Sequence, residues 1–411
     1  MAGATVLSLA LTGCGGSGGD STTTVSVLAA DYGERTAIPI SEYWDDLTER
    51  FSEEHEDITV EVELVPWEEL DATLAQRVEA GEPPDISQAG SYVQYVADDK
   101  LYRANEMISI PVISDFLASL AHAGEVQYEQ YAIPFIGSTP RLFYNEVLFE
   151  QAGIDGPPKS WDELLSAARA LDAIGVETPY ALQFGADSIH EEAMAWMLAA
   201  GGGYTDTMGA YTIDQEANVE ALTWLQENLV GEGLVGPQPA LDRGAAYRGF
   251  FTGEVGMMLG HPAVLGAIAA AGVPAKNADF PAKDGGAATP TGHNDWLIGF
   301  RDSGRAKEMG AFLNFLFRQE NVAVGTGDYG SVPATFSGAE ALLSNEKYRA
   351  LWPFVAQMPR AQLQPMSRQS WQQVRAEIRE ELGAAITADG DPEAVLRTLQ
   401  MRADEASRDK R

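Results

Sequence analysis

"ITVEVELVPWEELDATLAQRVEAGEPPDIS", residues 58–87, is the stretch that decides the fold class of this chain. Its first part alternates apolar and acidic side chains, with Val60, Val62 and Leu64 on one face, which is typical of a half-buried β-strand. The middle has the pattern of an amphipathic helix that ends at Gly81, and the last residues begin another strand. This order of elements predicts two parallel strands joined by a crossover helix.

The residues before this stretch repeat the same order of elements. The segment "TTVSVLAADY" (23–32) alternates and then becomes apolar, as a buried strand does. The segment "SEYWDDLTERFSEEHED" (41–57) has one apolar and one acidic helical face, with Ser41 as its expected N-cap. The first 100 residues therefore predict an α/β unit with a parallel sheet.

The remainder of the chain contains more helix than strand. Residues 125–135 predict a strand pair around a short turn, and residues 140–153 predict a strand that leads into a helix. Another helix is expected after Ser160, because Glu163 has the spacing of a capping box. Further helices are expected at 188–200, 215–230, 262–271, 304–319 and 369–387, and further strands at "PYALQFG", "VGMMLG" and "DWLIGF".

The charge and the cysteine content exclude several classes of protein. The net charge is −34, from 61 acidic and 27 basic residues, and it would repel nucleic acid, which is therefore not expected as a partner. A single cysteine leaves no internal disulfide, so stability has to come from the size of the core.

No motif predicts catalysis or metal binding. The segment "GTGDYG" (325–330) matches a dinucleotide-binding pattern but lacks the strand before it and the helix after it, so we interpret it as a flexible loop. The segment "HEEAM" (190–194) has Met194 where a zinc-protease helix needs its second histidine. The five histidines have no metal-ligand spacing, and we expect no metal, no cofactor and no enzymatic activity.

The N-terminal segment predicts a lipid anchor. "LSLALTGCGG" (7–16) combines a short apolar run with the only cysteine, Cys14, and resembles the lipobox of bacterial lipoproteins. We therefore expect a signal peptide at 1–13, a diacylated Cys14 and a Gly/Ser-rich tether at 14–22. No Lys or Arg precedes Arg35, so the basic region of a signal peptide is missing, and a free or structural cysteine is the alternative.

The order of several segments resembles extracellular solute-binding proteins of family 1, the maltose-binding-like proteins that serve bacterial ABC importers. The resemblance runs from about residue 25 to residue 335 and is carried by "FSEEHEDITVEVELVPWEEL", "EAGEPPDIS", "YAIPF", "LFYNEVLFEQAGIDGPPKSWDELLSAARAL", "FFTGEVGMML" and "LIGFRDSGRAKEMGAFLNFLFRQE". It implies an α/β, two-lobed, periplasmic-binding-protein-like fold of type II, with a hinge between the lobes and the ligand in the cleft between them.

This resemblance also implies a division into lobes, a location and a set of partners. We expect one lobe at 23–138 plus 290–335, with "DWLIGF" returning to the first sheet, and the other at 139–289 plus 336–411. The protein is expected to be a monomer outside the cytoplasm, anchored to the cell membrane through Cys14 and docking on the transmembrane subunits of an ABC permease.

Candidate ligand-binding residues follow strand ends, where ligands bind in open α/β sheets, and a sugar site needs aromatic faces with hydroxyl-pairing groups. The resemblance adds that Trp296 lies where the family often has a stacking aromatic, and His261 where many members have a ligand-facing residue. The alternatives are that Trp296 packs beneath the hinge and that His261 is structural. The candidates are Asp31, Tyr32, Glu34, Gln88, Ser91, Arg141, Asp187, His261, Asn294, Asp295, Trp296, Tyr329 and Arg360.

The leading hypothesis is capture of a neutral mono- or oligosaccharide. A polyamine or another small polar solute is the alternative within the same fold, because carboxylates with aromatic residues also bind cations. An extracellular glycoside hydrolase and a sensor lipoprotein are alternatives from other classes.

Overall fold

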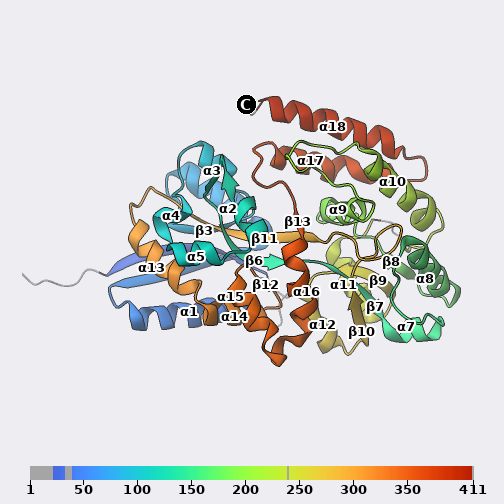
Figure 1. Cartoon of the computed structure of the whole chain (residues 1–411), viewed down its shortest axis with the longest axis horizontal. Coiled ribbons are helices and arrows are strands. Elements are labelled where there is room, and N and C mark those ends of the chain that lie inside the picture. Colours follow the sequence, from blue (N-terminus) through green and yellow to red (C-terminus); the bar gives the residue numbers. More distant parts are fainter. Residues whose placement is uncertain (1–21, 33–38, 238–239, 410–411) are drawn as a thin grey trace, which may run out of the picture.

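The expected parallel strands pair in a seven-stranded sheet. The computed structural model describes residues 22–32, 39–237 and 240–409. Strand β1 (Thr23–Asp31) pairs in parallel with β2 (Ile58–Pro66) on one side and β3 (Ile86–Ala89) on the other. Helices α1 (Ile40–Glu54) and α2 (Trp67–Ala80) are the crossover connections (Figure 1). The predicted α/β unit is confirmed.

A late strand completes this sheet. Strand β11 (Thr291–Gly299) lies between β3 and β6 (Ile133–Ser138) and is antiparallel to both. Strand β12 (Val332–Pro333) pairs with β6, and β13 (Gln362–Leu363) pairs with β11, so the order is β12-β6-β11-β3-β1-β2 with β13 to the side. The expected return of "DWLIGF" to the first sheet is confirmed.

A second sheet of four strands has the order β10-β7-β9-β8. Strand β7 (Arg141–Asn145) is antiparallel to β9 (Val255–Gly260) and to β10 (Ala275–Ala278), whereas β8 (Thr178–Ala181) is parallel to β9. The chain passes between the two sheets at 139–140 and again at 279–290. The two sheets lie at opposite ends of the molecule's long axis in Figure 1.

Helices surround both sheets. Next to the first sheet are α3 (Val93–Ala97), α4 (Ala104–Met107), α5 (Ile110–Asp115), α6 (Ala118–Ala123), α13 (Ala306–Leu316), α14 (Gln319–Gly327) and α15 (Phe336–Leu343), and the two-residue strands β4 (Glu125–Val126) and β5 (Glu129–Gln130) form a hairpin. The 3₁₀ turns η3 (Glu346–Leu351) and η4 (Met358–Arg360) flank α16 (Trp352–Gln357). The helices on the other side are α7 (Glu146–Gln151), α8 (Trp161–Ala173), α9 (Ile189–Ala199), α10 (Glu216–Trp224) with its π-helical extension η2 (Leu225–Val230), α11 (Arg243–Thr252), α12 (Val264–Ala271), α17 (Trp371–Glu381), the 3₁₀ turn η5 (Leu382–Ile386) and α18 (Pro392–Asp409).

The helices expected from sequence are all present, with small differences at their ends. Ser160 caps α8 as predicted, with its hydroxyl accepting a hydrogen bond from the Glu163 backbone N–H at 3.2 Å. Helix α1 begins at Ile40, one residue before the predicted cap Ser41, and Pro39 occupies the N-cap position without a side-chain bond. Helix α18 was not predicted.

The interpretation of "GTGDYG" as a loop agrees with the turn at 328–330 but is wrong for its first three residues, which are the last turn of α14. Glycine is required there by close packing rather than by a flexible backbone. A Cβ atom at Gly325 would lie 2.5 Å from Cε2 of Tyr43, and one at Gly327 would lie 2.5 Å from Cε1 of Tyr348. The aromatic rings therefore pack directly on the helix backbone.

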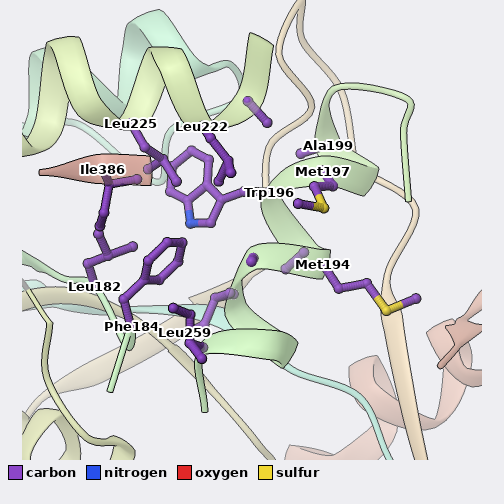
Figure 2. Packing of buried hydrophobic residues seen from close by; sticks show 14 of the residues in the cluster. Leu182, Phe184, Met194, Trp196, Met197, Ala199, Leu222, Leu225, Leu259 and Ile386 are labelled. Carbon is purple, nitrogen blue, oxygen red and sulfur yellow. The ribbon is translucent and has the colours of Figure 1, made fainter. Parts of the chain in front are cut away.

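The largest core lies beside the second sheet and is centred on Trp196 of α9 (Figure 2). Its ring is fully buried and contacts Trp161, Trp224 and Phe280 at centroid distances of 5.3, 5.6 and 4.9 Å. Its indole N–H donates to the buried Glu192 carboxylate at 3.2 Å. These contacts fix the orientation of α9, whose first turn carries His190 and Glu191.

We predict that Gly325→Ala destabilises the protein by about 1–3 kcal/mol, because the added methyl group overlaps Tyr43 in a packed core. Helix propensity alone would favour alanine by about 1 kcal/mol. Urea unfolding measures the change in unfolding free energy. The matched control is Gly383→Ala in η5, where the nearest atom lies 3.7 Å from the new Cβ, and this substitution should be neutral or stabilising. Equal effects of the two substitutions would contradict the packing explanation.

Candidate ligand-binding site

A cavity of about 740 Å³ lies between the elements of the two sheets. This size is within the range of pockets that enclose small molecules, roughly 300–1,000 Å³. Residues at the ends of β1 and β6 and in the first half of β11 contribute one part of its wall. Residues of α9, α11 and α17 and the segment after β9 contribute the other. A ligand in this cavity would therefore contact both halves of the molecule.

Asp295 of β11 is the centre of a hydrogen-bonded group at one side of the cavity. The Tyr32 hydroxyl donates to its carboxylate, and the Gln88 side-chain amide donates to the same oxygen at 2.9 Å. The carbonyl oxygen of Gln88 accepts from the Ala30 backbone N–H at 3.0 Å, which fixes the amide orientation. Burial raises the pKa of Asp295 to about 7, although Tyr32 and Gln88 lower it. Near neutral pH this carboxyl group can therefore either donate to or accept from a ligand hydroxyl.

A second polar group of the lining surrounds Glu191 and, unlike the group around Asp295, contains an ion pair. The Arg243 guanidinium contacts one carboxylate oxygen, and His293 Nδ1 lies 3.4 Å from the other. Burial would raise the pKa of Glu191, but Arg243 and the neighbouring histidines lower it well below its usual value. Burial also lowers the pKa of His293 and lowers that of His190 to about 4. The carboxylate is thus ionised and these two imidazoles are neutral at pH 7.

An aromatic wall completes the cavity. The rings of Tyr32 and Trp67 are stacked, with centroids 6.0 Å apart and an angle of 28° between their planes. Tyr247 and Phe251 of α11 lie on another part of the lining, with centroids 6.4 Å apart. Flat apolar faces beside hydroxyl-pairing groups are the two components that a carbohydrate site requires.

The structure places the predicted site residues in four groups, of which the last contains the residues that do not reach the cavity. Gln88 lies behind the wall and supports Tyr32 and Asp295. Glu34 and Cys14 lie outside the described residues. The predicted residues that line the cavity are Asp31, Tyr32, His261, Asn294, Asp295, Trp296 and Tyr329.

Trp296 lines the cavity but does not present an open ring face to it. Its side chain is 1% exposed and packs on Tyr92 at a centroid distance of 5.7 Å. This burial agrees with a packed ring rather than with a face open for ligand stacking. Trp67 is the partly buried tryptophan of the lining, and its ring stacks on that of Tyr32.

Arg141 was predicted to bind ligand, but its guanidinium is committed elsewhere. It donates to Asn277 at 2.7 Å and to Gln357 at 2.9 Å, and it forms an ion pair with Asp279. It does not line the cavity and instead connects β7 with the segment between β10 and β11 and with α16. Arg141 lies at the start of β7, where the chain enters the second sheet, but its side chain does not line the cavity.

Three other candidates also point away from the cavity. Ser91 donates to Gln94 and lies in a separate groove, and Asp187 accepts hydrogen bonds from Ser188 and from the Arg243 backbone. Arg360 lines a different, much smaller cavity. Ser91 is oriented by Gln94 three residues later, and Asp187 by the adjacent Ser188 and by the backbone of the distant Arg243.

Several residues that line the cavity were not predicted from the sequence. Glu191 lies in the first turn of α9, in the segment that follows the strand β8, so a search after strand ends could have included it. The chain has 61 acidic residues, and nothing in the sequence distinguished Glu191 from the others. The helix α11 was not predicted, and its residues could not be proposed. Among the residues that the structure describes, Glu191, His261 and His293 have donor atoms that all lie within 4.8 Å of one another, a cluster that their sequence spacing concealed. The missed lining residues include Trp67, His190, Glu191, Arg243, Tyr247, His293 and Arg375.

A cavity between two α/β units, with polar and aromatic side chains from both, is typical of a binding protein that encloses a small solute. Residues 37–323 match the family model of the bacterial extracellular solute-binding proteins. The chain belongs to this family, whose members deliver small molecules to ABC permeases outside the cytoplasm. In the described part of the chain, no helix combines the length and apolar character needed to cross a bilayer.

Comparison with known proteins supports this assignment over almost the whole chain. A putative binding protein of Brucella abortus is 27% identical over 98% of this chain and 96% of its own length. The sn-glycerol-3-phosphate-binding periplasmic protein UgpB of Pectobacterium atrosepticum is 24% identical over 85% of this chain and 84% of its own length. The crystal structure of the cyclic alpha-maltosyl-1,6-maltose binding protein of Arthrobacter globiformis has a TM-score of 0.81, 20% identity and a coverage of 94% of this chain and 100% of that one. The fold is therefore the two-lobed fold expected from the sequence.

We predict that Arg141→Met lowers the unfolding free energy by about 2–4 kcal/mol, because it leaves Asn277 and Gln357 without their buried partner. Ligand affinity should stay within about twofold, since Arg141 does not reach the cavity. The matched control is Arg397→Met, which removes an exposed ion pair with Glu393 on α18 and should change stability little. Chemical denaturation and calorimetric titration measure the two quantities, and a large loss of affinity without a loss of stability would contradict this assignment.

Proposed function

We propose that the protein captures a neutral mono- or oligosaccharide between its lobes and delivers it to an ABC permease. The observation that carries this proposal is the composition of the cavity, in which a stacked aromatic pair faces groups that can pair with hydroxyls. The structural relative from Arthrobacter globiformis, a cyclic alpha-maltosyl-1,6-maltose binding protein, agrees with a sugar ligand.

The balance of charge in the cavity favours a neutral ligand over a polyamine. A polyamine needs an excess of carboxylates, because each of its amino groups is cationic near neutral pH. Here the Glu191 carboxylate is already paired with Arg243, and Asp295 has a pKa of about 7. Among the residues that the structure describes, the charged members of the lining are Asp31, Glu191, Asp295, Arg243, Arg248 and Arg375.

A phosphorylated polyol is the second candidate. Its support is the relative that binds sn-glycerol 3-phosphate, together with the exposed Arg248 and the more buried Arg375 on the lining. Arginine pairs with phosphate oxygens through its planar fork. This candidate differs from the first mainly in whether these two guanidinium groups bind the ligand.

Closure of the lobes is the proposed mechanism. The lining comes from both sides of the cavity, so a ligand that contacts both sides favours the closed arrangement by its differential affinity. The segments at 139–140 and 279–290, which connect the two sheets, are the proposed hinge. The proposed lobes keep the limits expected from the sequence except for α15 and β13, which adjoin α14 and β11 of the first sheet and are therefore assigned to the first lobe. Lipidation of Cys14 would hold the protein beside its permease.

A panel of solutes tests the proposal by thermal unfolding. A sugar at about 100 times its Kd should add about 2.7 kcal/mol to the free energy of unfolding and raise the midpoint. The panel contains maltose, maltotriose, a cyclic maltotetraose, sn-glycerol 3-phosphate, spermidine and amino acids. A shift with the phosphate ester alone would favour the second candidate, and a shift with spermidine alone would overturn the charge argument.

We predict that Trp67→Ala weakens binding of the sugar found in that panel by about 10- to 100-fold, or about 1.4–2.8 kcal/mol, because it removes half of the stacked aromatic pair. The matched control is Trp352→Ala on α16, which is also partly buried but does not line the cavity. Calorimetric titration measures both affinities. Equal affinities of the two variants would remove the aromatic pair from the ligand site.

A further inference from the structure

We propose that Glu191, His261 and His293 bind a divalent transition-metal ion such as zinc in the wall of the cavity. Two imidazoles and one carboxylate are a common ligand set for zinc, and a site with three protein ligands leaves a fourth position for water or a substrate oxygen. This inference goes beyond the capture of a sugar and does not depend on which solute is bound.

The distances between the donor atoms fit one ion. All three donors lie within 4.8 Å of one another. In a tetrahedral zinc site with bond lengths of about 2.0–2.1 Å, two ligand atoms lie about 3.4 Å apart. His293 Nδ1 lies 3.4 Å from one oxygen of Glu191, and His261 Nε2 lies 4.0 Å from the other. These two distances end on different oxygens of Glu191, and all three donors lie within 4.8 Å of one another. A rotation of the carboxylate and an approach of the donors by up to about 1.4 Å would therefore complete the geometry.

Each ligand is held by a different element, and one ring is oriented from behind. Glu191 is in α9, which is fixed by the Trp196 core, His261 directly follows β9, and His293 is in β11. His261 Nδ1 lies 2.7 Å from the hydroxyl of Ser138, so its Nε2 is directed toward Glu191. A hydrogen bond to the second ring nitrogen is the usual support for a metal-binding histidine.

The surroundings of His293 point in the same direction. Its ring packs edge-on against that of His261, with centroids 5.0 Å apart. Its Nε2 is buried and has no hydrogen-bond partner among the described residues, so this ring, unlike that of His261, is oriented by packing and by Glu191 rather than by a bond to its second nitrogen. The Nδ1 atom, which faces Glu191, is the donor available to an ion.

Arg243 is the main competitor for the carboxylate, and its geometry leaves room for an ion. It contacts the Glu191 oxygen Oε2, whereas His293 faces Oε1. A carboxylate has two oxygens and about four lone-pair positions, so it can accept from a guanidinium and bind a metal at once. The positive charge of Arg243 nevertheless lowers the affinity of the site for a cation. Because Arg243 and the ion are both positive, the fourth metal position should favour an anionic or hydroxyl oxygen.

A metal at this position would connect the two halves of the molecule. His293 belongs to the seven-stranded sheet, while Glu191 and His261 belong to elements beside the four-stranded sheet. The ion would therefore be bound best when these halves are close, and its fourth position would face the space in which a solute is enclosed.

Titration of the chelator-treated full chain with zinc tests this proposal. We expect one equivalent to bind, measured by calorimetry and by metal analysis after dialysis, and we expect cobalt(II) to give the visible spectrum of tetrahedral coordination. His261→Ala, His293→Ala and Glu191→Gln should each weaken binding by at least about 100-fold, and Ser138→Ala by about tenfold. Thermal unfolding without metal shows whether each variant is folded.

The matched control is His122→Ala. His122 lies 3.0 Å from the Glu125 carboxylate but is not part of the three-donor cluster, so its loss should leave zinc binding unchanged. Equal binding by this control and the three ligand variants would overturn the proposal, as would the absence of a saturable site in the wild-type chain. Zinc binding with no sugar affinity would leave the metal site intact while removing the proposed function, so the two can fail separately.

Discussion

The antiparallel pairing of β11 with β3 and β6 is the constraint on which the rest of the structure depends. It places residues 291–299 in the middle of a sheet whose other strands are formed mostly by the first 138 residues. The chain has to leave this sheet after β6, build the second sheet and return, so the two halves cannot be separate segments. The cavity lies between elements of the two sheets that these crossings connect.

The register of β11 also divides this strand into two functional parts. Leu297 packs into one hydrophobic cluster, while Trp296 and Ile298 pack into another on the opposite face. The pairing with β6 shifts between Asp295 and Trp296, and on the other side of that shift His293, Asn294 and Asp295 are only partly buried and line the cavity. Irregular pairing of this kind often redirects side chains next to functional sites. A one-residue slip would reverse the faces of the buried part, so core packing fixes which polar groups reach the ligand.

Local sequence patterns predicted the elements, while contacts between distant residues decided the site. The alternation around Val62 and the cap at Ser160 depend on neighbours within a few positions, and the structure contains both features. Arg141 pairs with Asn277 and Asp279, more than 130 positions away, and no pattern near Arg141 contains that information. The same holds for Glu191, which meets His261 seventy positions later and meets His293 only after the chain has crossed back to the first sheet.

Glu191 shows why a strongly acidic chain can still have a balanced cavity. Its carboxylate is buried, so an unpaired charge there would be costly, and the Arg243 guanidinium offsets that cost while keeping the group ionised. The pair holds one carboxylate oxygen in place whatever the cavity contains, and the Trp196 core holds the helix that carries it. Because both constraints come from one side of the cavity, Glu191 does not depend on the other side for its position. His293 and Asp295, which belong to the first sheet, are the groups that would bind a solute or an ion together with this carboxylate.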